Sequence, residues 1–165
     1  MDERRNPDDA RAEAAERDGV ILLDAPDNGC FGCSPHNTRG LRLVWRQGEG
    51  EVRAFYTAES HFRGAPGVVH GGIQATLLDE TIGVALHRAF GDPEDLFLVT
   101  ADFELRYRRP VPTGRQIELV GRFERREGRS YFGSGSIVDR TGALLTSATA
   151  RWVAVPAPEA RARPA

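Results

Sequence analysis

The chain contains no lysine, and all 22 of its basic residues are arginine. This absence excludes Schiff-base catalysis and a Walker-type phosphate loop, because both need a primary amine that a guanidinium group cannot replace. Long apolar runs are also absent: none approaches the ~18 residues of a membrane span, and no apolar segment of a signal peptide follows the charged start. We therefore expect a cytoplasmic protein without a membrane partner.

An excess of charge of one sign is missing as well. The chain has 22 basic and 24 acidic residues, a formal net charge of −2 at pH 7 and a pI near 6.1. A nucleic-acid-binding surface needs a strong positive excess and usually a platform of stacking aromatic residues. Residues 125–129 are rich in arginine, but only Tyr131 and Phe132 lie near them. No nucleic-acid partner is expected.

Cysteine is scarce, and Cys30 and Cys33 form a single CxxC motif. A zinc site takes three or four protein ligands, and here only His36 and the remote His61 could complete one, without a second CxxC or HxxxH pair. A thioredoxin-like motif opens a helix after a strand, whereas this motif lies in a stretch rich in Gly, Pro and Asn. We predict two reduced thiols in a tight loop and no metal site.

The length of 165 residues suits one domain. Residues 1–19 are highly charged with almost no large apolar side chains, and residues 156–165 are dominated by Pro, Ala and Arg. Neither segment can bury itself against a core, so we predict mobile tails. Residues 20–155 have no internal repeat and no linker, which predicts a single domain.

Alternation of apolar and polar residues with a period of two predicts strands on both sides of one helical segment. Residues 41–56 have the pattern of a hairpin, and four strands follow from residue 97 to residue 155. In the first of them one face would carry Phe97, Val99, Ala101, Phe103, Leu105 and Tyr107, and the other Thr100, Asp102, Glu104 and Arg106. The predicted fold class is α+β with one antiparallel sheet.

The segment from Gly72 to Phe90 has apolar residues over most of the circumference of a helix, which is typical of a buried helix. A narrow stripe interrupts them, formed by Gly72, Thr76, Asp79, Glu80 and Gly83. Acidic residues are rarely buried without a partner. The stripe either serves a functional site or faces solvent or a subunit interface with hydrated carboxylates.

The glycine-rich segment 62–72 leads into this helix. The first turn of a helix has unpaired N–H groups, and glycine lets a substrate oxygen approach them. Gly72 and Asp79 would lie on one face, but roughly 10 Å apart along the axis. They cannot both act on one carbonyl group in the same chain. If both act, a second antiparallel copy of the helix must supply one of them, which predicts a homodimer with two composite sites.

These residues resemble a known family. The segment His70-Gly71-Gly72-Ile73-Gln74-Ala75-Thr76-Leu77-Leu78-Asp79-Glu80, together with residues 107–112 downstream and residues 30–33 and 37–41 upstream, is similar to the PaaI-like acyl-CoA thioesterases with the hotdog fold. The resemblance covers roughly residues 28–155. It implies a long central helix wrapped by a curved antiparallel sheet, and a dimer of two such units, with a tetramer left open. Coenzyme A would enter only as part of the substrate, and no other cofactor is implied.

The resemblance also implies roles for single residues. Asp79 matches the catalytic carboxylate, which acts as nucleophile or as general base for water, and Gly71, together with Gly72, matches the backbone donor to the thioester carbonyl. His70 matches the motif histidine, with a mainly positional role. Thr100 matches a hydroxyl that orients the water or the carboxylate in one branch of the family, whereas Gly64 stands where many members have an Asn.

The acyl-CoA substrate carries phosphates, for which arginine is a natural bidentate partner. The candidates for this contact are Arg108, Arg109, Arg125, Arg126 and Arg129, although hairpin arginines are usually only solvated. Two alternatives remain open at this point. One is a non-catalytic acyl-CoA-binding or regulatory module with the same fold. The other, a hydratase, would need a His five residues after Asp79, where the chain has Val84.

Overall fold

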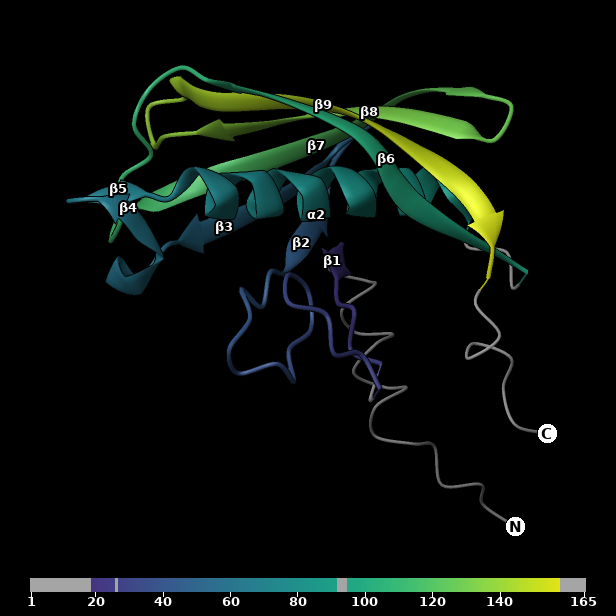
Figure 1. The fold of residues 1–165 in the computed structure, drawn as a ribbon, viewed down its shortest axis with the longest axis horizontal. Coiled ribbons are helices and arrows are strands. Elements are labelled where there is room, and N and C mark those ends of the chain that lie inside the picture. Colours follow the sequence, from purple (N-terminus) through teal and green to yellow (C-terminus); the bar gives the residue numbers. More distant parts are fainter. Residues whose placement is uncertain (1–18, 26, 92–94, 158–165) are drawn as a thin grey trace, which may run out of the picture.

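The computed structural model describes residues 19–25, 27–91 and 95–157 (Figure 1). Most of the two predicted tails, residues 1–19 and 156–165, lies outside these residues, so the domain boundaries stay a prediction. Within the described part of the chain, no helix combines the length and the apolar character that crossing a membrane requires.

The elements follow the predicted order of a hairpin, a helix and four long antiparallel strands, with short additions. The first strands are β1 (Val20–Ile21), β2 (Trp45–Gln47) and β3 (Val52–Thr57). A 3-10 turn η1 (Ser60–Phe62) and a small ladder of β4 (Arg63–Ala65) and β5 (Val68–Val69) lead into the helix α2 (Gly71–Phe90). The long strands are β6 (Leu96–Tyr107), β7 (Gln116–Glu127), β8 (Ser130–Val138) and β9 (Leu144–Pro156).

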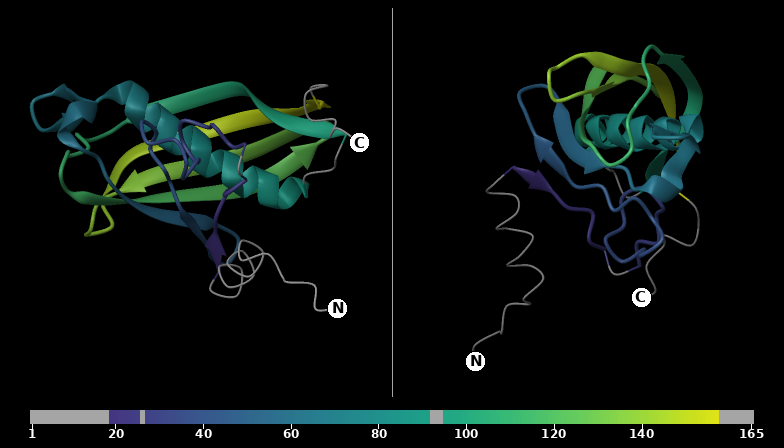
Figure 2. Two further views of the ribbon diagram at one scale, coloured as in Figure 1. Left: turned by 90° about the horizontal axis from the view of Figure 1, so that it is seen from below. Right: turned by 90° about the vertical axis from the view of Figure 1, so that its left-hand side faces the viewer.

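Seven strands form one antiparallel sheet in the order β1-β2-β3-β7-β8-β9-β6. The sheet curls around α2, which lies in its concave face, as the end-on view in Figure 2 shows. The segment between β1 and β2 lies on the opposite side of the helix (Figures 1 and 2). The chain therefore has the long central helix and the wrapped sheet that the family resemblance implies.

The helix is buried because the sheet approaches it closely. Its largest fully buried side chains are Leu77, Leu78, Ile82 and Leu86. Gly133 and Gly135 face the helix from β8, and a Cβ atom on either would lie within 3 Å of Ile82. The helix ends at Gly91, whose φ of 76° is the left-handed conformation that favours glycine at a helix C-terminus.

Polar groups on the buried side of the helix have partners. The amide of Gln74 donates to the Val69 carbonyl at 2.8 Å and accepts from the Thr146 hydroxyl at 2.6 Å. The Thr81 hydroxyl donates to the Leu77 carbonyl and accepts from Trp45 Nε1 at 3.2 Å. These bonds offset the cost of removing polar groups from water.

The predicted alternation along β6 holds after residue 101 but is wrong before it, because the strand contains a bulge. Thr100 pairs with Trp152 and Asp102 pairs with Arg151, so Ala101 is an extra residue that shifts the register by one. Thr100 thereby faces the helix on the same side as Phe103, Leu105 and Tyr107, whereas Asp102 is exposed on the outer face. Before the bulge, the fully buried position is Leu98 rather than a neighbour at residue 97 or 99.

The predicted hairpin begins later than expected. Leu41 and Leu43 are buried as the pattern indicates, but they precede β2, which starts at Trp45. Their N–H groups donate to the carbonyl groups of Phe31 and Gly32 at 2.7 and 2.9 Å. The backbone thus pairs with the CxxC loop instead of extending the sheet.

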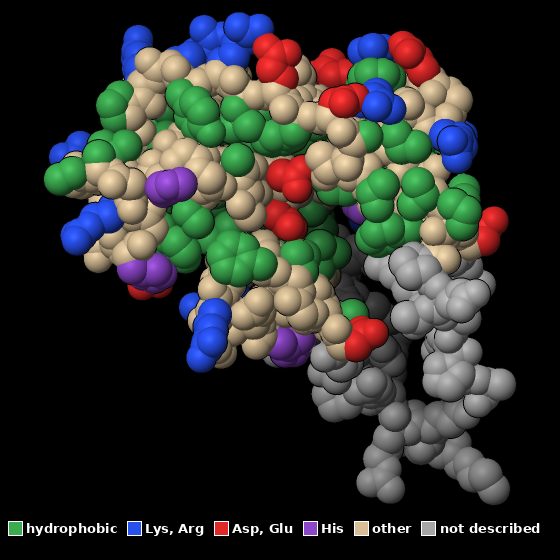
Figure 3. All heavy atoms as spheres, in the orientation of Figure 1, with side chains coloured by type: hydrophobic (Ala, Val, Ile, Leu, Met, Phe, Trp, Pro, Cys, Tyr) green, Lys and Arg blue, Asp and Glu red, His purple; other side chains and the backbone are tan. Residues whose placement is uncertain are grey.

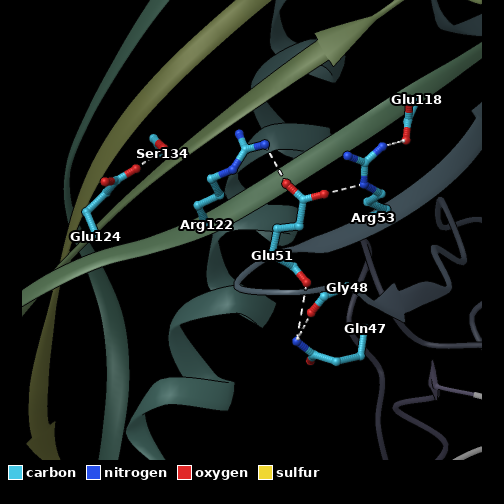
Figure 4. A network of polar contacts seen from close by, with 8 residues as sticks. All are labelled: Gln47, Gly48, Glu51, Arg53, Glu118, Arg122, Glu124 and Ser134. Atoms are coloured by element: carbon cyan, nitrogen blue, oxygen red, sulfur yellow. Dashed lines mark hydrogen bonds and ion pairs between the residues drawn. The ribbon is translucent and has the colours of Figure 1, made fainter.

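The outer face of the sheet carries ion pairs, shown in Figure 4. Glu51, which follows the turn after β2, pairs with Arg53 of β3 and with Arg122 of β7, and Arg53 also bonds Glu118 at 2.5 Å. Ser134 of β8 bonds Glu124 of β7. Such exposed pairs contribute little stability each, so the buried face of the sheet sets the fold.

We predict that Gly121→Ala destabilises the protein, because a Cβ atom in this position of β7 would lie 2.4 Å from the Thr81 carbonyl oxygen of the helix. The backbone atom cannot move aside without shifting the helix, so the free energy of unfolding should fall by about 1–3 kcal/mol. Urea unfolding measures the change. The matched control is Gly29→Ala, where no atom lies within 4 Å of the added Cβ. Equal stability of the two variants would contradict the close approach.

Candidate active site

Asp79 lies halfway along α2, on the side of the helix that the stripe of small and polar residues marks. Its side chain is half-buried, and Oδ1 accepts a hydrogen bond of 3.0 Å from the Thr100 hydroxyl of β6. Burial raises the pKa of the Asp79 carboxyl group above its usual value, and the Thr100 hydrogen bond opposes this shift. The β6 bulge is what brings Thr100 to this carboxylate.

The first turn of α2 contains the predicted backbone donors. His70 is the N-cap, and its Nδ1 accepts the Gly72 N–H at 2.9 Å, so that donor is already in use. The Gly71 N–H has no hydrogen-bond acceptor within the described residues. The carbonyl oxygen of Gly71 accepts the Tyr107 hydroxyl at 3.1 Å. The first turn therefore leaves the Gly71 N–H free for a ligand.

The structure does not bring the donor and the carboxylate together within one chain. Gly71 and Asp79 are eight residues apart on a continuous helix, which separates them by roughly 12 Å along the axis. Figure 3 shows acidic side chains at the middle of the face that carries the helix, bordered by hydrophobic side chains. If both groups act on one carbonyl group, they must therefore come from two different chains, as the sequence also predicts.

Glu80, the residue after Asp79, contacts a different part of the chain. Its Oε1 accepts a hydrogen bond of 3.3 Å from the Cys30 thiol. Burial raises the pKa of the Glu80 carboxyl group, and the two cysteine thiols lower it through hydrogen bonds. Glu80 is thus covered by the CxxC loop, while Asp79 faces β6.

Gly64 lies in β4, against the N-cap rather than at the carboxylate. A Cβ atom at Gly64 would lie 3.2 Å from Cα and Cδ2 of His70. Any larger side chain at this position would press on the histidine that caps the helix. In this structure, Gly64 gives room for the His70 cap.

The five candidate arginines do not converge in one chain. The N–H groups of Arg108 and Arg109 donate to the Leu145 carbonyl, near the helix N-terminus that Tyr107 contacts. Residues 125–129 lie at the β7–β8 hairpin, where Tyr131 packs edge-on against Phe90 at the other end of the helix. A helix of 20 residues is roughly 30 Å long, so these arginines form two separate groups.

Two of the three hairpin arginines have side-chain partners. Arg125 stacks over Phe132 at 3.9 Å on the outer face and pairs with Glu127 at 2.7 Å. Arg126 lies 5.1 Å from the Tyr131 ring, and its Nε donates to the Gly128 carbonyl. Arg129 is exposed. These contacts fit a solvated hairpin, whereas Arg108 and Arg109 lie near the candidate donor.

Two contacts at the site were not predicted from the sequence. Tyr107 was assigned to a strand face, and its bond to the Gly71 carbonyl depends on the bulge at Ala101. The bond between Cys30 and Glu80 joins residues 50 positions apart. Neither contact has a local signal in the sequence, because each joins residues that only the fold brings together.

One long helix in the concave face of a curved antiparallel sheet, with a glycine-rich first turn and a carboxylate at its middle, defines a hotdog fold of the thioesterase class. The sequence profile described as Thioesterase superfamily matches residues 66–146, which include the whole helix and β6 to β8. Residues 66–146 of the chain thus match the Thioesterase superfamily, and the fold described above is the hotdog fold.

Solved structures and curated relatives agree with this assignment. A thioesterase superfamily protein of known crystal structure is 25% identical, with a TM-score of 0.68 over 93% of this chain and 81% of its own. A phenylacetic acid degradation-related protein from Ralstonia eutropha JMP134 is also 25% identical, with a TM-score of 0.60 over 68% of this chain and 85% of its own.

Among curated relatives, acyl-coenzyme A thioesterase THEM4 from Mus musculus is 32% identical over 114 residues, which is 67% of this chain and 46% of that protein. THEM4 from Xenopus laevis is 28% identical over 112 residues, which is 67% of this chain and 48% of that protein. The chain spans about half the length of the curated relatives it matches.

We predict that His70→Ala destabilises the protein by about 1 kcal/mol, because the Gly72 N–H loses its acceptor at the start of the helix. His70→Asn should restore most of this stability, since asparagine is one of the best N-cap residues. Urea unfolding of the three proteins gives the comparison. A positional role for His70 would be refuted by an alanine variant as stable as the parent.

Proposed function

We propose that the protein hydrolyses acyl-CoA thioesters to a free carboxylate and coenzyme A, in sites formed between two copies of the chain. The observation that carries this proposal is the placement of two complementary groups on one helix. Asp79 is a half-buried carboxylate oriented by Thr100, and the Gly71 N–H at the helix start has no acceptor within the described residues. Acyl transfer needs these two parts, a base or nucleophile and an oxyanion donor.

In the proposed reaction the Gly71 N–H of one copy, which has no acceptor among the described residues, donates a hydrogen bond to the thioester oxygen. The positive end of the helix dipole strengthens this donor. Asp79 of the other copy either takes a proton from a water molecule that attacks the carbonyl carbon or attacks the carbon itself. The tetrahedral intermediate then collapses, the C–S bond breaks, and the thiolate leaves and takes up a proton, which the protonated Asp79 supplies where water was the nucleophile. Where Asp79 itself attacked, the acyl group stays on Asp79 as an anhydride, and water then hydrolyses it to the free carboxylate and restores Asp79.

The raised pKa of Asp79 supports its role as a base. Burial makes the carboxylate more basic than one in water. The Thr100 hydroxyl limits the shift and holds one carboxylate oxygen in place, which leaves the other for water or for the substrate carbon. Thr100 is in this scheme a positioning residue for Asp79.

A homodimer is the assembly that this scheme requires. Two antiparallel helices would bring the first turn of each to the middle of the other. Strand β6, with 12 residues, forms one edge of the sheet, and an edge strand is a surface on which a second sheet can pair. Thr100 lies on this strand, so the same edge that would join the two copies also orients the carboxylate.

The acyl-CoA class of substrate is supported by the curated relatives, which are named acyl-coenzyme A thioesterases. Of the candidate phosphate contacts, Arg108 and Arg109 lie near the helix N-terminus, next to the proposed donor, and both are exposed. We assign the phosphates of coenzyme A to these two arginines ahead of those at the hairpin.

We predict that Asp79→Asn lowers kcat by at least about 100-fold, because the amide cannot accept a proton or attack the substrate. Release of coenzyme A from a panel of short, long and aromatic acyl-CoAs measures the activity, corrected for the thiols of Cys30 and Cys33. Asp102→Asn is the matched control, since this carboxylate lies on the outer face and pairs with Arg151. It should keep the activity of the parent.

Sedimentation and urea unfolding must first establish that both variants are folded and assembled like the parent. An Asp79→Asn variant with full activity would refute the proposed role of Asp79. A parent protein without turnover on any member of the panel would refute thioester hydrolysis.

We predict that Gly71→Pro lowers kcat by about 100- to 1000-fold, the range for loss of one oxyanion donor. Proline removes the backbone N–H, adds a ring, and is well tolerated at the first position of a helix. The preceding residue, His70, has φ −56° and ψ 138°, which suits a residue before proline. Gly71→Ala is the control, because it adds a Cβ atom near Tyr107 but keeps the N–H.

Co-expression of Asp79→Asn and Gly71→Pro chains then tests whether the site is shared between copies. A mixed dimer has one site with both groups intact and one with neither. Since random pairing makes roughly half of the dimers mixed, about a quarter of the parent activity should return. A mixture no more active than the two separate variants would place both groups in one chain and refute the composite site.

A further inference from the structure

The CxxC loop has a fixed place on the helix that the proposed reaction does not use. Gly32, between the two cysteines, lies against Glu80, and a Cβ atom at Gly32 would be 2.2 Å from Cγ and Cδ of that side chain. The carbonyl groups of Phe31 and Gly32 accept the N–H groups of Leu41 and Leu43. The loop and the middle of α2 are thus held in contact, and a Cβ atom at the point of contact would require the Glu80 side chain to move.

This contact brings three potential metal ligands together. One ligand atom from each of Cys30, Cys33 and Glu80 lies within 4.8 Å of the other two, and Cys30 Sγ is 3.3 Å from Glu80 Oε1. Two ligands of a tetrahedral zinc ion, with bonds of about 2.0–2.3 Å, lie roughly 3.5–3.8 Å apart. The side chains would need only small rotations to bind one ion.

Both sulfur atoms also accept hydrogen bonds from N–H groups. The Gly32 N–H donates to Cys30 Sγ at 3.3 Å, and the Asn28 side-chain amide donates to Cys33 Sγ at 3.8 Å. Asn28 is itself fixed, since its Oδ1 accepts the Cys30 N–H at 3.0 Å and its Nδ2 donates to the Leu23 carbonyl at 2.8 Å. Such donors around the ligands stabilise thiolate charge and orient the sulfur atoms.

We propose that Cys30, Cys33 and Glu80 bind a zinc ion, with water in the fourth position. Two thiolates with one carboxylate favour zinc over magnesium or calcium, which prefer oxygen ligands alone. The ion would clamp the segment between β1 and β2 to the middle of α2, one residue from Asp79. The proposal does not depend on thioester hydrolysis.

The sequence alone predicts no metal site, because it offers only His36 and the remote His61 as further ligands for the CxxC motif. His36 instead pairs with Asp24 at 2.9 Å, and His61 lies 3.5 Å from Glu59. The third ligand comes from the helix, 47 residues after Cys33 in the numbering of the chain. The spacing of residues in the sequence cannot predict this third ligand, because only the fold places the Glu80 carboxylate next to the two cysteines.

The test is the metal content of the full chain, purified under reducing conditions without chelator and after removal of any histidine tag. We expect about one zinc ion per chain by plasma mass spectrometry. Cys30→Ser, Cys33→Ser and Glu80→Gln should each lower this content at least tenfold. Glu59→Gln, which removes an exposed carboxylate outside the cluster, should retain the ion.

A second measurement uses only the parent protein, so it does not depend on the folding of a variant. Metal-free, reduced protein titrated with Co²⁺ should develop a thiolate-to-cobalt charge-transfer band that saturates at one equivalent. Zn²⁺ should displace the cobalt and raise the melting temperature of the protein. Absence of the band, together with no zinc in the purified protein, would overturn the proposal. Retention of zinc by a Cys30→Ser/Cys33→Ser double variant would overturn it as well, since the ion would then lie elsewhere.

Discussion

The close approach of α2 to the sheet is the constraint on which the other features of this protein depend. Gly121 of β7 and Gly133 and Gly135 of β8 give the helix room, and a side chain at any of them would meet atoms of Thr81, Ile82 or Leu78. With the helix pressed into the sheet, its polar groups on that side must find partners in the sheet or in neighbouring backbone. Gln74 and Thr81 do so through hydrogen bonds that the same close packing makes possible.

On the side of the helix away from the sheet, polar groups are not needed for packing and can contact a ligand. Gly72 is exposed, and Thr76 and Asp79 are half-buried, so one face of a single rigid element presents both its N-terminus and a carboxylate. A rigid helix fixes the distance between the two. The separation that prevents them from acting together in one chain is also what would set the geometry between two antiparallel chains.

Much of this architecture could be predicted from the sequence, because it follows from repeated local patterns. The helix from Gly72 to Phe90 differs from the observed one by a single residue, since its apolar periodicity extends over five turns. The long strands were predicted by their alternation, except where a bulge at Ala101 shifts the register. A bulge has no consistent signal in one sequence, because it depends on how a strand curves over the helix. The short strands β1, β4 and β5 contain too few residues for any period to be measured.

The roles assigned to the residues of the candidate site stay predictions, and their contacts could be predicted only in part. The stripe on the helix predicted that Asp79 and Glu80 need partners, and the structure gives each a different one, Thr100 and Cys30. Thr100 is 21 positions from Asp79, and Cys30 is 50 positions from Glu80, so distant parts of the chain determine the partner of each acid. No local pattern in the sequence contains that information.

The two neighbouring acids are distinguished by what covers them rather than by their chemistry. Successive residues on a helix point about 100° apart, so one element cannot cover both. The loop at Gly32 lies so close to Glu80 that not even a methyl group fits between them, and a substrate cannot reach that carboxylate from the loop side. Asp79 is half-buried and bonds the Thr100 hydroxyl of the edge strand β6. The CxxC loop packs on Glu80 and not on Asp79, so of the two acids Asp79 is the one that the proposed substrate could approach.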